Sequence, residues 1–281
     1  MACLLKNGLV LLGLNWCLSA TALAASDIAL PEKLHLVLHE NSAPFSFREE
    51  GEVQGISVDI YRALAEQLGV ELKVSMAPYP RAIQMVYQGQ ADTTPVFRLQ
   101  SFPRAGLPQQ GLFFSDPSWR LPLVYYANPD NPLDFDLERE PGSYKIGVLR
   151  FGLSSDLPAI EGADNTYYYG SIATLLRALR AGRIDLAGLT PVGALYWQQQ
   201  TLLGFKPVFQ FASLDVLSAY SQKSLKAGAE PTCRRISQAY REMAEDGRLE
   251  AILAKYQMEE IQTYSELPQA EAGPKCEMRS G

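Results

Sequence analysis

Two blocks in which strand-like and helix-like segments alternate constrain the fold of this 281-residue chain more than any other feature. In the first block, residues 34–38 are rich in strand formers, and residues 56–68 place apolar side chains at mostly helical spacing between two glycines. Residues 70–74 alternate as a strand does, 81–87 predict a short helix, and 91–94 enter another strand. This β-α-β-α-β order predicts a parallel sheet covered by helices.

The second block repeats the pattern. Residues 145–149 predict a strand, 171–180 a helix with Ser171 as its N-cap, 184–189 a strand and 192–199 another helix. Two α/β units are therefore expected, separated by a loop rich in Asn and Pro.

Further along the chain, residues 216–220 predict a returning strand, and 232–256 a long amphipathic helix interrupted near Gly247. Residues 268–281 are expected to be a tail with little structure of its own.

The N-terminus has the order of a secretory signal peptide. Lys6 precedes an apolar run over residues 9–14, and the small residues Ala22 and Ala24 stand before the expected cleavage point after residue 24. A membrane anchor is the alternative, but the run is shorter than the ~20 residues that a spanning helix needs. We expect an exported, periplasmic mature protein without a membrane span.

Cysteine usage agrees with export. Cys3 and Cys17 would leave with the leader, so Cys233 and Cys276 remain as an even pair, for which a disulfide is the expected state in an oxidising compartment. Such a bond stabilises by about 4 kcal/mol in the chain-entropy model. Two free thiols are the alternative.

Composition and motifs exclude several functions. The net charge of -6 and the sequence pI of about 5.1 weigh against nucleic acid as a partner. The two histidines, His35 and His39, lack further ligands or triad partners at workable spacing, so no metal site is expected. No phosphate-binding glycine motif follows a strand, and no cofactor is expected.

Aromatic and arginine residues gather instead at the ends of predicted elements, at residues 44–47, 76–81, Arg98 and 101–104. An arginine held by such a loop binds a carboxylate through two parallel hydrogen bonds, and a neighbouring ring supplies an apolar wall. We expect these residues to form a cleft for a carboxylate ligand.

A series of short motifs over residues 34–256 resembles the type II periplasmic solute-binding proteins of the polar amino-acid ABC-transporter class, family 3. These motifs are Pro44–Phe47, Gly55–Ile60, Gly89–Asp92, Ser101–Arg104, Phe114–Pro117, Gly147–Val148, Gly182–Asp185 and Asp246–Leu249. The resemblance implies an α/β, two-lobe fold of the periplasmic-binding-protein type with two crossover hinge strands. It places lobe 1 at residues 25–124 and 219–262, lobe 2 at 125–218, and a tail at 263–281.

The resemblance also implies roles for individual residues. Arg104 matches the arginine that clamps the ligand's α-carboxylate, and Ser101 matches the hydroxyl beside it. Tyr79 falls where an aromatic ring packs on the ligand, and Ser42 to Phe45 match another wall. Arg98 is a second candidate for the clamp, because residues 105–111 form a small insertion after Arg104.

One position departs from the family pattern. The family binds the ligand's α-ammonium with an aspartate five residues after Asp185, and here that residue is Thr190. A hydroxyl cannot neutralise a cation, and burying an unpaired ammonium costs several kcal/mol. We expect a carboxylate ligand without a conventionally bound α-amine, unless Glu40, Glu161 or Asp215 takes the aspartate's place.

These observations predict a monomeric binding protein that captures a small carboxylate-bearing solute, amino-acid-like or organic acid, for an inner-membrane ABC permease. One alternative is an enzyme on the same scaffold, similar to cyclohexadienyl dehydratases. The other is an orphan sensor or interaction protein that no longer binds a small molecule.

Overall fold

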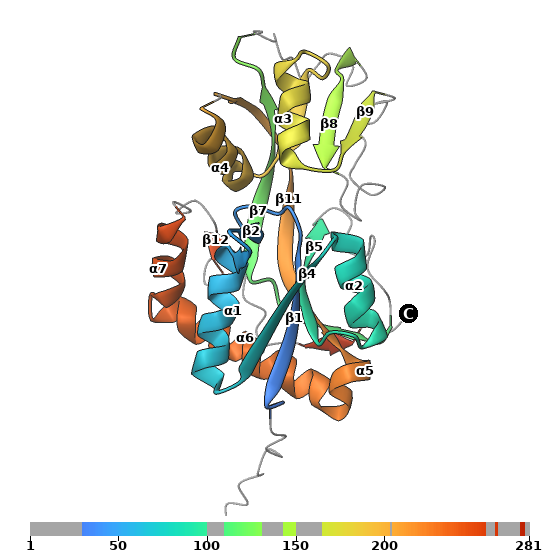
Figure 1. The fold of residues 1–281 in the computed structure, drawn as a ribbon, viewed down its shortest axis with the longest axis vertical. Helices are drawn as coiled ribbons and strands as arrows, with labels where there is room; N and C mark the ends of the chain where they lie inside the picture. Colours follow the sequence, from blue (N-terminus) through green and yellow to red (C-terminus); the bar gives the residue numbers. More distant parts are fainter. Residues whose placement is uncertain are drawn as a thin grey trace, which may run out of the picture.

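Two lobes joined by a pair of long strands make up the protein (Figure 1). The structure is a computed structural model that describes residues 30–99, 110–130, 143–149, 165–202, 204–256, 262–263 and 276–278. One sheet runs through both lobes in the order β4-β1-β5-β11-β7-β10-β8-β9. This architecture confirms the expected α/β fold with two lobes and two crossover strands.

Lobe 1 is built on three parallel strands: β1 (Lys33–His39), β4 (Glu71–Ala77) and β5 (Thr93–Leu99). Helix α1 (Ile56–Leu68) packs against β4, and α2 (Tyr79–Gln88) packs against β1 and β11. The predicted elements of the first block are all present, and α2 begins two residues before its predicted start.

The start of α1 holds the loop that follows β1. The amides of Ile56 and Ser57 donate to the carbonyls of Pro44 and Phe45, at 3.0 and 2.9 Å. A Cβ on Gly55 would lie 2.5 Å from the Phe45 carbonyl oxygen, and Gly55 has a φ of 124°. Only glycine allows this close approach, so the loop is fixed by residues ten to twelve positions further along the chain.

A short hairpin of β2 (Phe47–Glu49) and β3 (Glu52–Gln54) stands between that loop and α1. It was not predicted, because three-residue strands carry too little alternation to be recognised.

Strands β7 (Trp119–Ala127) and β11 (Lys206–Ser221) cross between the lobes (Figure 1). They pair with each other in antiparallel fashion, from Lys206 opposite Ala127 to Val216 opposite Trp119. The strand predicted over 216–220 corresponds only to the last part of β11. Its earlier half is mostly exposed or half-buried and has two register shifts, so no regular alternation marks it. The predicted lobe boundaries fall inside these two strands.

Lobe 2 comprises β8 (Ile146–Leu149), β9 (Thr166–Tyr169), β10 (Leu186–Leu189), α3 (Ile172–Arg180) and α4 (Pro191–Thr201). Strands β8, β9 and β10 are parallel, and β10 joins the sheet to β7 in antiparallel fashion. Ser171 caps α3 by accepting from the amide of Thr174, at 3.3 Å, as predicted. Strand β9, with its run of tyrosines, was not predicted.

After β11 the chain stays on lobe 1 through α5 (Gln222–Leu225), η2 (Lys226–Gly228), α6 (Ala229–Glu245) and α7 (Arg248–Lys255). Gly247, with a φ of 82°, separates the last two helices as predicted. Short strands β12 (Gln262–Thr263) and β13 (Glu277–Met278) pair with β7 and with β6 (Leu112–Phe114). Strand β13 lies within the predicted tail.

A disulfide joins the buried Cys233 of α6 to the buried Cys276, beside β13. Within the described parts of the chain, no helix combines the length and the apolar character that crossing a membrane requires.

Candidate ligand-binding site

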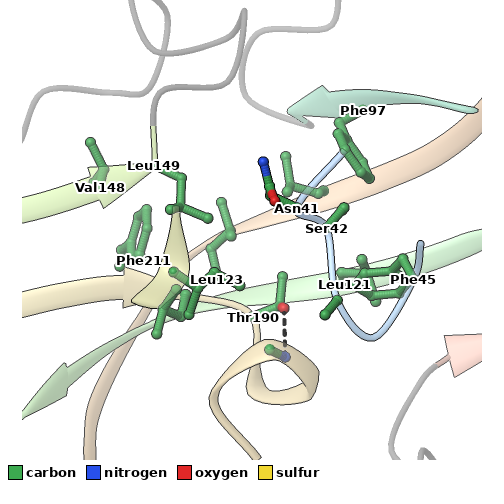
Figure 2. Close-up of a pocket in the computed structure, with 16 residues that line it drawn as sticks. Asn41, Ser42, Phe45, Phe97, Leu121, Leu123, Val148, Leu149, Thr190 and Phe211 are labelled. Atoms are coloured by element: carbon green, nitrogen blue, oxygen red, sulfur yellow. Dashed lines mark hydrogen bonds between the residues drawn. The ribbon is translucent and has the colours of Figure 1, made fainter. Parts of the chain in front are cut away.

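A pocket that is partly open to solvent lies where the two lobes meet (Figure 2). Both lobes and both crossover strands supply its walls. The lining residues are Asn41, Ser42, Ala43, Phe45, Phe97, Leu121, Leu123, Val148, Leu149, Ile172, Gly188, Leu189, Thr190, Gly193, Phe211 and Leu214. None of these described lining residues has an ionisable side chain.

Phe97, at the end of β5, forms one wall and is held from behind by two other rings. Tyr79 stacks on it with centroids 5.4 Å apart and 19° between the planes, and His39 lies 5.4 Å away. The Phe97 amide donates to the Tyr79 hydroxyl at 3.0 Å. Tyr79, expected to pack on the ligand, therefore supports Phe97 and is not among the lining residues.

Burial sets the protonation state of both supporting rings. His39 is 4% exposed, and removal from water lowers its pKa from 6.5 to about 3. Burial raises the pKa of Tyr79, against the weaker opposing effect of its hydrogen bond from Phe97. Both rings are neutral at physiological pH and serve as packing.

The other two phenylalanines of the pocket are backed in the same way. The rings of Phe45 and Trp119 lie 5.4 Å apart. Phe211 stacks on Tyr125 with centroids 4.0 Å apart and 14° between the planes. Each pocket phenylalanine thus rests on a second ring outside the pocket, so the walls are firmly packed.

Asn41 and Ser42 bring polar atoms to the lobe 1 side of the pocket (Figure 2). The Ser42 amide donates to the Ser46 carbonyl at 3.1 Å, and the Ser46 hydroxyl donates to the His39 carbonyl at 2.7 Å. Asn41 has a φ of 56°, a left-handed conformation that asparagine tolerates better than most residues. These backbone contacts hold both residues at the end of β1.

Thr190 stands at the end of β10 and starts α4. Its hydroxyl oxygen accepts from the amide of Gly193 at 3.2 Å, which makes it the N-cap of the helix (Figure 2). It also lines the pocket, as the resemblance implied for this position. A hydroxyl that accepts one hydrogen bond can still donate its own proton.

Arg98 lies on the other side of the sheet from the pocket. Successive strand residues face opposite sides, and its neighbour Phe97 lines the pocket. Its guanidinium contacts the buried carboxylate of Asp215 at 3.0 Å, and Arg120 reaches the same carboxylate at 3.1 Å. The structure therefore brings neither Arg98 nor Asp215 into the pocket.

The remaining predicted site residues lie elsewhere or outside the described ranges. Glu40 is exposed and lines a neighbouring hollow. Ser101, Arg104 and Glu161 are outside the residues that the structure describes.

Sequence reasoning missed most of the apolar wall. Phe97, Leu121, Leu123, Phe211 and Leu214 come from β5 and the two crossover strands. Alternation along 119–127 was the available signal, because β7 is buried at every second residue over most of its length. No comparable signal marks the early half of β11.

A two-lobe α/β frame with a pocket between its lobes is the fold of periplasmic-binding-protein-like proteins. The sequence model of the bacterial extracellular solute-binding proteins, family 3, matches residues 34–259, and the chain belongs to this family. No curated protein matches the chain.

Solved structures share the fold. A histidine kinase sensor domain with similarity to periplasmic binding proteins superimposes with a TM-score of 0.68, at 22% identity over 82% of this chain and 97% of that one. An ancestral arginine-binding protein bound to arginine has a TM-score of 0.62, at 20% identity over 82% and 100%. The ancestral amino acid-binding protein AncCDT-1, a precursor of cyclohexadienyl dehydratase, has a TM-score of 0.63, at 17% identity over 80% and 95%.

Proposed function

We propose that the protein captures a small carboxylate-bearing solute between its lobes and delivers it to an inner-membrane ABC permease. The observation that carries this proposal is the pocket itself, whose walls come from both lobes and from the strands that join them. A ligand there contacts both lobes at once, so its binding favours their approach. The proposed lobes are residues 25–124 with 219–262, and 125–218.

The carboxylate is assigned to Arg104, with Ser101 beside it, on the resemblance of their motif to that of the family. Both follow β5 in the chain, and the same strand supplies Phe97 to the pocket. Arg98 is a poorer candidate for the clamp, because it is engaged by Asp215 on the opposite side of the sheet.

Capture is favoured over dehydratase chemistry because the described lining residues offer contacts and no group that moves a proton near neutral pH. The periplasm is the proposed compartment, in keeping with the family, the leader-like residues 1–24 and the Cys233–Cys276 bond.

A thermal-shift panel of carboxylates, amino acids and matched alcohols tests the proposal. A ligand at about 100 times its dissociation constant adds about 2.7 kcal/mol to the free energy of unfolding, which is several degrees for a chain of this size. Arg104→Ala should abolish the shift caused by carboxylates. Arg98→Ala is the matched control, and should lower the melting temperature but leave the ligand-induced shift.

Three results would contradict the proposal. The clamp assignment fails if Arg98→Ala abolishes binding and Arg104→Ala does not. The proposal that the protein captures a carboxylate solute fails if no carboxylate shifts the melting temperature. That result would favour a sensor or interaction protein. Formation of product from a prephenate-like compound would favour the enzyme.

A further inference from the structure

The apolar part of the pocket is continuous across the two lobes. Lobe 1 and the crossover strands contribute aromatic and leucine side chains, and lobe 2 contributes aliphatic ones. The described residues of this surface are Phe45, Phe97, Leu121, Leu123, Leu214 and Phe211, with Val148, Leu149, Ile172 and Leu189 facing them. A charged ligand group placed here would lose its water and find no opposite charge among these side chains.

Second rings pack against two of the phenylalanines of this surface. The stacking of Tyr125 on Phe211 and of Tyr79 on Phe97 limits the freedom of the pocket rings to turn aside and admit water. A wall that is already packed in place binds an apolar group without the entropy cost of ordering its own side chains.

A glycine lies directly beneath two side chains of the pocket wall. A Cβ at Gly188 would lie 3.2 Å from a Val148 methyl carbon and 3.3 Å from the Phe211 ring. Glycine at this point of β10 therefore lets Val148 and the Phe211 ring pack closely against the strand.

The polar contact available from lobe 2 is the neutral hydroxyl of Thr190. The Thr190 oxygen accepts from Gly193, and the hydroxyl proton remains available to an acceptor in the pocket. A carbonyl, ether or carboxylate oxygen can accept that proton, and a neutral hydroxyl cannot neutralise the charge of an ammonium group.

We propose that the ligand's group beyond its carboxylate is uncharged and apolar, an aryl or branched alkyl group. This inference rests on the proposed function and names the substrate class of the same site. The ligand is then an aryl- or branched-alkyl-substituted organic acid, with its apolar group between Phe97 and Phe211 and an acceptor oxygen toward Thr190.

A matched series of acids tests the substrate class by calorimetric titration of the full mature chain. The probes are 3-phenylpropionate and 4-methylpentanoate, against glutarate with a second anion and 5-aminopentanoate with a cation. The first two are expected to bind at least about tenfold more tightly than the charged pair. Equal or tighter binding of glutarate or 5-aminopentanoate would overturn the inference while leaving the capture of carboxylates intact.

Measuring the binding of an alcohol distinguishes a failure of this inference from a failure of the proposed function. If 3-phenylpropan-1-ol binds as tightly as 3-phenylpropionate, the apolar pocket stands and carboxylate capture fails. If none of the compounds binds, both fail.

Two phenylalanines of β11 provide a matched pair of variants. Phe211→Ala is expected to weaken 3-phenylpropionate binding about tenfold or more, because it removes a pocket wall. Phe209→Ala, at an exposed residue of the same strand that does not line the pocket, should leave binding unchanged. Equal effects of the two changes would overturn the inference. Should Phe211→Ala fail to fold, Gly188→Ala, which crowds the same space, is expected to weaken binding.

Discussion

Thr190 has two roles that depend on one oxygen atom. The oxygen caps α4 through the Gly193 amide, and the proton of the same hydroxyl is left for a ligand. An aspartate at this position would cap the helix equally well and add a negative charge to the pocket. The difference between the two residues therefore lies in ligand choice rather than in folding.

Thr190→Asp should add binding of an α-amino acid, because a carboxylate at this position can pair with the ammonium. L-Phenylalanine, whose side chain suits the apolar walls, is expected to bind at least about tenfold better, a gain of about 1.4 kcal/mol. Thr190→Asn is the control, since it keeps the cap without the charge and should show no gain. Calorimetric titration of the three proteins checks this, and an equal gain in Thr190→Asn would contradict it.

His39 makes stability depend on pH. Its pKa is about 3 in the folded protein, against the ordinary 6.5, because burial opposes its charged form. As pH falls below about 6.5, His39 takes up a proton in the unfolded chain but not in the folded one. The free energy of unfolding is therefore highest above pH 6.5 and falls toward pH 3, by up to about 1.4 kcal/mol per pH unit.

His39→Gln should remove this contribution, so its urea midpoint should fall less steeply than that of the parent between about pH 6 and pH 4. His35→Gln is the control. Burial lowers the pKa of His35 too, but this ring is only half-buried and forms a hydrogen bond to Ser75, so its environment differs from that of the fully buried His39. Parallel urea midpoints for parent and His39→Gln across this range would refute the prediction.

At the scale of elements, β5, β11 and β7 are joined on the side of the sheet away from the pocket. Asp215 of β11 stands in register with Arg98 of β5 and Arg120 of β7, and its side chain is 6% exposed. One carboxylate thus links two guanidiniums on the neighbouring strands. The link holds the crossover strand β11 in its register next to the pocket leucines.

Asp215→Asn should lower the free energy of unfolding by about 3 kcal/mol, because two half-buried guanidiniums lose their shared carboxylate. Asp130→Asn, in the exposed pair with Arg180, is the control and should cost less than about 1 kcal/mol. Urea unfolding measures both. Similar costs for the two changes would mean that the buried carboxylate adds no more than a surface ion pair.

Across the whole molecule, the C-terminal segment is tied back to lobe 1. The Cys233–Cys276 bond spans 43 residues and links α6 to the chain at β13, which pairs with β6. Strand β6 in turn pairs with the lobe 1 end of β11. The bond therefore holds residues 276–278 against the lobe that carries β5 and Phe97.

Replacing both cysteines by serine should lower the free energy of unfolding by up to about 4 kcal/mol, the loop-closure value for a bond of this span. Ligand affinity measured with 3-phenylpropionate should hardly change, because neither cysteine lines the pocket. Denaturant unfolding and calorimetry test the two parts. An unchanged unfolding free energy would show that the bond adds nothing to stability.

The amino-acid sequence by itself determined where elements start and stop and how they alternate. Gly55, Ser171 and Gly247 mark helix ends through backbone freedom or capping, and apolar periodicity marks the helices between them. These signals act over a few residues, so a single sequence contains them. The α/β order followed from them, whereas the two-lobe expectation came from the resemblance of the short motifs to the family.

Only the tertiary structure decided which residues meet at the site. Phe211 rests on Tyr125, and Arg98 turns to Asp215, 117 residues away, instead of toward the ligand. The full length of β11 depends likewise on its pairing with β7. Cross-strand pairs and stacked rings join residues far apart in the chain, and no local pattern records which partner each will have. The apolar walls of the pocket arise in this way, from contacts that exist only once the sheet has formed.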